Sequence, residues 1–152
     1  MTRVLVTSIL LVVWHGLFAY TKTTVPVITM ERTVCYGTCP IYTLTIFDDG
    51  KVVYDGKEFV KKKGRVESKI TKQQLNELIA EFTKIDYFNL KSNPDCPEEW
   101  TDNPSAITSL SWQGKNQTIR HYHGCKGSQV LEDLTKLENK IDETVNSAQW
   151  IR

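Results

Sequence analysis

Four cysteines carry the most specific chemistry in this sequence: Cys35, Cys39, Cys96 and Cys125. Cysteines can form disulfides, exchange thiols or bind a metal ion, depending on compartment and neighbours. If residues 36–38 form a three-residue hairpin loop, Cys35 and Cys39 become opposed neighbours with Cα atoms about 4.5–5.5 Å apart, a distance that a disulfide spans. We therefore expect a Cys35–Cys39 bridge, with Cys96 paired to Cys125. A crossed pairing is the alternative.

The second bridge would hold down a long irregular stretch, Lys91 to Pro104. Loops of this length are unusual in compact domains and are commonly functional or covalently pinned. In the chain-entropy model a Cys96–Cys125 bridge contributes about 3.5 kcal/mol, against about 2 kcal/mol for Cys35–Cys39. The longer bridge is therefore expected to matter more to stability.

Two histidines near the last cysteine suggest a metal site. On an extended strand His121, His123 and Cys125 would point to one face, and their N and S atoms suit zinc or copper with an open coordination position. The same pattern fits a half-buried strand with two hydrogen-bonded histidines, since Ile119 shares that face and Cys125 has Cys96 as a partner. We expect no cofactor, with zinc or copper as the alternative.

Thiol redox chemistry has weaker support. The Cys35–Cys39 spacing is one residue longer than the Cys-x-x-Cys exchange motif, and no βαβ pattern surrounds it. A thiol-redox role therefore remains only as part of the alternative function, which would use the cysteines and the two histidines.

An acidic loop around a tryptophan is a further candidate site. It contains Glu98, Glu99, Trp100 and Asp102. Paired carboxylates beside an aromatic platform resemble a glycosidase site, but surface acidic loops are far commoner and Asp102 also suits a plain turn. We interpret the loop as a possible partner-binding surface and expect no catalytic residues in the chain.

The N-terminal segment has the features of a secretory signal peptide. Arg3 precedes the apolar run Val4 to Val13, and Ala19 offers a cleavage site before Tyr20. An uncleaved anchor is the alternative, although the run is shorter than the roughly 20 residues that span a membrane. We expect residues 1–19 to be removed, leaving 20–152 as a single domain with no membrane span.

Strands are predicted in the first part of this domain and again between its two helices. Ranges rich in Val, Ile, Thr and Tyr predict strands over 27–34, 41–47, 52–54, 65–70, 105–112 and 117–123. Asp49-Gly50 predicts a type I′ hairpin turn, and a second hairpin is expected around Gly114.

Two amphipathic helices complete the pattern. Thr71 and Gln74 form a capping box before the first helix. Ser128 caps the second, whose expected apolar stripe is Val130, Leu134, Leu137, Ile141 and Val145. We predict an α+β fold: a four-stranded N-terminal meander and a C-terminal hairpin in one antiparallel sheet, with two helices packed on one face.

The charge is nearly balanced, with 19 Lys and Arg against 18 Asp and Glu. Nucleic-acid binding depends on neutralising many phosphates, so nucleic acid is not an expected partner. A protein or small-molecule ligand is expected instead.

Residues 31–42, with the core Cys35-Tyr36-Gly37-Thr38-Cys39-Pro40, and the later run 49–54 resemble an uncharacterised bacterial domain-of-unknown-function family of exported proteins. The family motif is Cys-[Phe/Tyr]-Gly-x-Cys-Pro-x-Tyr, and the resemblance extends to the 101–105 turn and the last helix. It implies a fold and export, without an activity, substrate or cofactor.

The sequence therefore predicts a secreted, periplasmic or cell-envelope protein. We expect a disulfide-stabilised, non-enzymatic binding or envelope-associated module that meets a partner through its loops, chiefly 91–104. The alternative is a metal-binding or thiol-redox protein.

Overall fold

The computed structural model describes residues 24–152, so the expected signal peptide and its cleavage site lie outside the described residues. The large sheet is built from β1 (Pro26–Arg32), β2 (Ile41–Phe47), β3 (Lys51–Glu58), β4 (Gly64–Lys69), β6 (Ser105–Trp112) and β7 (Lys115–Tyr122). Its strands are antiparallel and lie in the order β4-β3-β2-β1-β6-β7. The predicted meander and C-terminal hairpin are thus confirmed, and β1 joins them.

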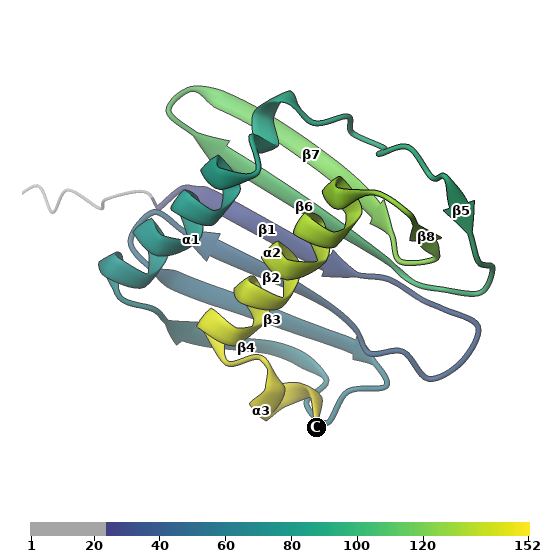
Figure 1. Ribbon diagram of the computed structural model, residues 1–152. Helices are drawn as coiled ribbons and strands as arrows, with labels where there is room; N and C mark the ends of the chain where they lie inside the picture. The colour runs from purple at the N-terminus through teal and green to yellow at the C-terminus, as the bar shows by residue number, and fades with distance from the viewer. Residues whose placement is uncertain (1–23) are drawn as a thin grey trace, which may run out of the picture.

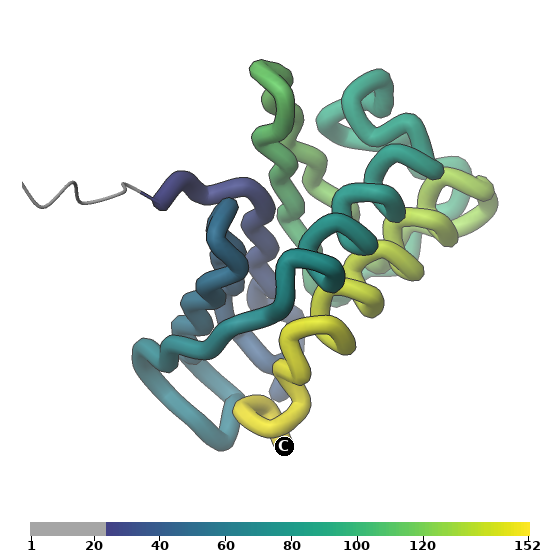
Figure 2. Tube along the Cα trace, turned by 90° about the vertical axis from the view of Figure 1, so that its left-hand side faces the viewer, coloured from purple at the N-terminus to yellow at the C-terminus, as the bar shows by residue number. Residues whose placement is uncertain are grey.

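The helices are α1 (Lys72–Lys84), the 3₁₀ helix η1 (Tyr87–Asn89), α2 (Gln129–Val145) and the short α3 (Ala148–Ile151). In Figure 1, α1 and α2 cross the same face of the sheet, and Figure 2 shows them side by side as a second layer. The structure confirms the predicted α+β fold. Within residues 24–152, no helix is both long and apolar enough to cross a membrane.

Both helices begin where their capping residues predict. Thr71 and Gln74 form the reciprocal capping box of α1, and Ser128 accepts a hydrogen bond from the Leu131 amide at the start of α2. The predicted stripe of α2 is wrong at its first position, because Val130 is exposed and Leu131 is buried instead. The stripe then continues through Leu134, Leu137, Ile141 and Val145.

The core lies between the helices and one face of the sheet. Alternation in β2 places Tyr42, Leu44 and Ile46 on that face, all at most 3 % exposed. The ring of Tyr54 packs 5.5 Å from Tyr42 and 4.9 Å from Trp150 between ring centroids. These aromatic contacts fix the C-terminal segment against β2 and β3.

Two hairpin turns differ in kind. Gln113 and Gly114 lie between the paired residues Trp112 and Lys115 and both have positive φ, 51° and 76°. A two-residue type I′ turn requires positive φ at both positions. At the Asp49-Gly50 turn only Gly50 has positive φ, 84°. The predicted hairpin is present there, but the type I′ assignment is wrong because that turn type needs two residues with positive φ.

The 91–104 stretch contains one short regular element. β5 (Glu98–Glu99) pairs with β8 (Cys125–Lys126) in a separate two-stranded sheet. The stretch is thereby tied to the segment that follows β7.

Candidate functional site

A row of four neighbouring residues crosses the helix-facing side of the large sheet. Tyr42 on β2 pairs with Arg32 on β1, Arg32 with Ala106 on β6, and Ala106 with His121 on β7. Opposed residues of neighbouring strands project to the same face. Ala106 is fully buried and small, so the row leaves space between the Arg32 and His121 side chains.

Helix α2 places two carboxylates over this row. Glu138 and Asp142 are four residues apart, so they lie on the same side of the helix one turn apart. Glu138 is completely buried although it belongs to the apolar face of α2. A buried carboxylate is stable only when it is paired and hydrogen-bonded, and the row beneath supplies the partners.

The Glu138 carboxylate contacts three side chains. Its Oε1 lies 2.8 Å from His121 Nδ1, and its Oε2 lies 2.7 Å from His123 Nε2. Arg32 Nη1 donates to the same Oε2 at 3.2 Å. Burial by itself raises the pKa of Glu138, but the hydrogen bonds and charges of the two histidines outweigh it and hold the pKa below 4.5. The carboxylate is therefore ionised at neutral pH.

Asp142 holds the other half of the site. Its Oδ2 accepts from Arg32 Nη2 at 2.9 Å, and its Oδ1 accepts from the Tyr42 hydroxyl at 2.7 Å and from Ser147 Oγ at 2.6 Å. Burial and the charge of Asp142 raise the pKa of Tyr42 far above its usual value, so this hydroxyl stays a donor. Arg32 also has a raised pKa, since Asp142 and Glu138 outweigh the effect of its burial.

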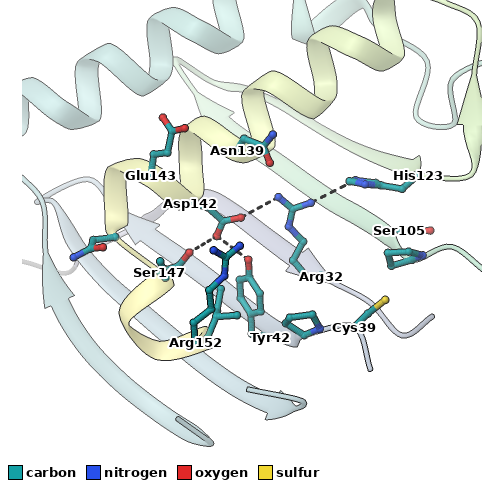
Figure 3. A pocket seen from close by; sticks show the side chains of 15 residues that line it. Arg32, Cys39, Tyr42, Ser105, His123, Asn139, Asp142, Glu143, Ser147 and Arg152 are labelled. Atoms are coloured by element: carbon teal, nitrogen blue, oxygen red, sulfur yellow. Dashed lines mark hydrogen bonds and ion pairs between the residues drawn. The ribbon is translucent and has the colours of Figure 1, made fainter. Parts of the chain in front are cut away.

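A pocket of about 790 Å³ opens over these residues. Figure 3 shows Arg32, Asp142 and Tyr42 together at its floor, with His123 on the far side of Arg32. One wall is the end of α2 and the segment after it, including Asn139, Glu143 and Arg152. The opposite wall contains Cys39, Pro40 and Pro104 from two loops, and Ser105 from the start of β6.

One disulfide closes the first loop, and the other joins the second loop to β8. Cys35 is bonded to Cys39 and Cys96 to Cys125, with Cα separations of 5.8 and 5.0 Å. The expected three-residue hairpin at 36–38 is wrong, because β1 ends at Arg32 and β2 begins at Ile41, so Cys35 and Cys39 close a bend inside an eight-residue loop. The Tyr36 amide donates to the Asp102 carbonyl at 3.2 Å, which joins the two loops.

The expected metal-binding residues come together only in part. His121 and His123 lie beside each other, with ring centroids 4.7 Å apart. Cys125 does not join them because its sulfur is bonded to Cys96, and a metal ligand must be a free thiolate. Glu138 takes the third place, with one ligand atom from each of the three residues within 4.8 Å of the others.

The acidic loop is exposed and separate from the residues that line the pocket. Glu98 and Glu99 form β5, Trp100 is 66 % exposed and Asp102 has a left-handed backbone with φ 69°. The Trp100 amide donates to the Gly124 carbonyl at 2.8 Å, and its own carbonyl accepts from the Tyr122 hydroxyl. The backbone of the loop is thus held while its side chains face solvent.

Sequence reasoning missed Arg32, Tyr42, Glu138 and Asp142. One signal could have found three of them. Arg32 is in phase with buried Ile28 and Met30, Tyr42 with Leu44 and Ile46, and Glu138 with Leu134 and Ile141. Polar residues that interrupt an apolar face need buried partners.

The comparison with known families is informative for most of the chain. A family model described as Domain of unknown function (DUF6438) matches residues 26–145. No curated protein matches the chain significantly.

Proposed function

The chain belongs to the DUF6438 family of domains of unknown function, and we propose that it is an exported, non-enzymatic binding module. Its ligand would be a small polar molecule held in the pocket over Arg32, Tyr42 and Asp142. The fold then serves to hold a fixed set of hydrogen-bonding groups at the end of α2.

The observation that carries this proposal is the pocket's pre-organised floor. Its volume of about 790 Å³ falls within the range usual for small-molecule sites. Arg32 and Asp142 are held by their mutual ion pair and by Tyr42, so few side chains need to be ordered on binding. Pre-organisation of this kind lowers the entropic cost of association.

The lining favours a ligand that is polar without a large net charge. Arg32 and Arg152 offer positive charge, and Asp142 and Glu143 offer negative charge. Asn139, Asn146 and Ser147 add neutral donors and acceptors, while Pro40, Pro104 and Ile151 add apolar surface. Sugars, amino acids and short peptides combine polar and apolar groups in this way.

A binding role is favoured over catalysis because the two carboxylates are already engaged. Glu138 accepts from both histidines and Arg32, and Asp142 accepts from three donors. A general acid or base needs a proton-transfer site directed at substrate. In this cluster the carboxylates direct their oxygen atoms to the protein's own donors.

Export to the cell envelope is part of the proposal. Two disulfides support it, since such bonds persist mainly in oxidising compartments. The predicted signal peptide at 1–19 supports it independently. The mass of the protein recovered from cells tests export, since cleavage after Ala19 would leave Tyr20 as the first residue.

Nuclear magnetic resonance tests the pocket directly. Backbone amide spectra would be recorded while monosaccharides, amino acids and dipeptides are added in turn. We expect a member of this panel to shift the amide signals of Arg32, Tyr42, Asp142 and Ser147 together. Asp142→Asn should weaken the binding of that ligand, whereas the matched control Asp133→Asn, on the side of α2 next to α1, should not. If no compound shifts the pocket residues, the small-molecule proposal is contradicted.

The acidic loop supports a second, protein-binding surface. Trp100 is exposed on a backbone held by the Cys96–Cys125 bond and the β5–β8 pair. Rigid exposed aromatic residues are typical of interaction hot spots. We therefore keep Glu98, Glu99, Trp100 and Asp102 as the proposed partner-binding loop.

A further inference from the structure

We infer that His121, His123 and Glu138 form a binding site for a divalent transition-metal ion, with Zn²⁺ as the best-suited ion. The site lies beside the proposed ligand pocket but does not depend on it, since its three ligands differ from the Tyr42–Asp142–Ser147 group. His123 also lines that pocket, so metal binding is measured without an organic ligand.

The three ligand atoms already face one another. His121 Nδ1, His123 Nε2 and a Glu138 oxygen all lie within 4.8 Å. Two imidazole nitrogens and one carboxylate oxygen are a common zinc ligand set. Zinc bonds of about 2.0–2.1 Å in a tetrahedron place ligand atoms about 3.3 Å apart. His123 contacts Oε2 at 2.7 Å and His121 contacts Oε1 at 2.8 Å; these contacts would open by about half an ångström as both nitrogens turn toward the ion.

The framework holds these ligands in place. His121 is on β7, His123 follows directly after that strand, and Glu138 is in the middle of α2. The His123 amide donates to the Pro104 carbonyl at 2.9 Å, which fixes the backbone beyond the strand. His121 is 2 % exposed and Glu138 is fully buried, so neither side chain is free to leave.

The charges of the cluster favour an added cation. Arg32 contributes one positive charge, while Glu138 and Asp142 contribute two negative charges when both are ionised. With neutral histidines the cluster has an excess negative charge, and Glu138 is wholly removed from water. A buried carboxylate with this charge balance favours an added metal cation beside it.

Arg32 can make room for the ion. Its Nη1 lies 3.2 Å from Glu138 Oε2 and 3.4 Å from His123 Nε2. Its Nη2 is bonded to Asp142 at 2.9 Å. The guanidinium can therefore give up its contact with Glu138 and keep an ion-pair partner. His123 lines the pocket, which provides the route from solvent.

Metal binding requires a defined movement of protons. Ionised Glu138 only accepts hydrogen bonds, so His121 Nδ1 and His123 Nε2 carry the protons in the metal-free contacts. To bind the metal through these nitrogens, each neutral histidine must lose that proton and carry one on its other ring nitrogen instead. The two tautomers give different ¹⁵N chemical shifts, which supplies a readout independent of any activity.

The test is titration of the purified, disulfide-intact protein with Zn²⁺ and Co²⁺ at pH 7.5. We expect one ion per chain by calorimetry, visible Co²⁺ absorption of a four-coordinate site, and the tautomer change of both histidines on addition of Zn²⁺. His123→Gln should weaken binding at least about tenfold, equivalent to about 1.4 kcal/mol. The matched control Asp133→Asn should leave it unchanged.

Several outcomes would overturn the metal site. These are no stoichiometric binding at 100-fold molar excess of Zn²⁺, binding that survives His123→Gln, or histidine tautomers unchanged by Zn²⁺. Glu138→Gln is a further test if circular dichroism shows that it folds, and His123→Gln with the ¹⁵N spectra carries the test if it does not. None of these results bears on whether a small polar molecule binds over Asp142.

Discussion

Arg32 Nη2 donates to Asp142 Oδ2 at 2.9 Å, across 110 positions of the chain. This contact joins the end of β1 to the last turns of α2. Asp142 also accepts from Ser147 just after that helix, where the left-handed Asn146, with φ 54°, ends it. One carboxylate therefore fixes the strand, the helix end and the pocket wall relative to one another.

Replacing Glu138 by alanine should cost much of the stability of the fold. The change leaves His121, His123 and Arg32 without their shared acceptor, and removal of one partner from a buried charge pair costs about 3–5 kcal/mol. Urea unfolding with the disulfides intact would measure the loss. Glu132→Ala at an exposed position of the same helix is the control and should cost less than about 1 kcal/mol. Equal effects of both substitutions would contradict the central place of Glu138.

The stability of the protein should fall in acid partly because of Glu138. Its pKa in the folded state lies below the usual 4.5, so the unfolded chain takes up the proton first as the pH falls. The stabilising contribution is complete above about pH 5 and is lost as the pH falls through the folded-state pKa. Free energies of unfolding between pH 7 and 3 should therefore fall more steeply for the natural protein than for Glu138→Gln. Parallel curves would show that other groups cause the acid effect.

Enlarging Ala106 should disturb the buried cluster. Ala106 lies between Arg32 and His121 in the cross-strand row, and both of these residues contact Glu138. Ala106→Leu would place a larger side chain at a fully buried position beside these groups, and overpacking of this kind costs about 1–3 kcal/mol. Ala80→Leu on the exposed side of α1 is the matched control, with little expected change. Thermal unfolding of both variants would measure the effect. An Ala106→Leu variant with unchanged stability would contradict the packing argument.

The two disulfides should contribute unequally. Replacing Cys96 and Cys125 together by serine should cost about 3.5 kcal/mol, and replacing Cys35 and Cys39 about 2 kcal/mol, because the longer bridge restricts the unfolded chain more. Denaturant unfolding of the two double variants measures both values. The reverse order would mean that native-state effects outweigh loop length.

Removal of two tryptophan side chains should affect stability to very different extents. Trp100 is 66 % exposed, whereas Trp150 is 8 % exposed and packs on Tyr54. Trp150→Ala should cost about 3–5 kcal/mol, and Trp100→Ala less than about 0.5 kcal/mol. Each variant serves as the control for the other in the same melting experiment. A destabilised Trp100→Ala would show that the exposed ring supports the loop and is not free for a partner.

The sequence was sufficient for the architecture because local signals determine it. The capping box at Thr71, the cap at Ser128 and the period-two pattern of Ile41–Phe47 each act over a few residues. Strand alternation also predicted that His121 and His123 share a face. The disulfide partners followed from loop position, although the bend between Cys35 and Cys39 was placed in too short a hairpin.

The buried cluster could not be assembled in the same way. Arg32 and Glu138 are 106 positions apart, and nothing local in either segment specifies the other. Their contact exists only because β1 enters the middle of the sheet and α2 crosses above it. The sequence could identify each as a polar residue on an apolar face, but the pairing depends on the complete tertiary structure.

The central position of β1 also determines when this sheet can be completed. β1 is bonded on one side to β2, which follows it closely, and on the other to β6, which begins only at Ser105. Until β6 is in place, the backbone N–H and C=O groups along one side of β1 have no partner, and such an edge can pair with another chain. A fragment that ends before Ser105 would therefore tend to aggregate. Shortened forms of this protein need the C-terminal hairpin to cover this side of β1.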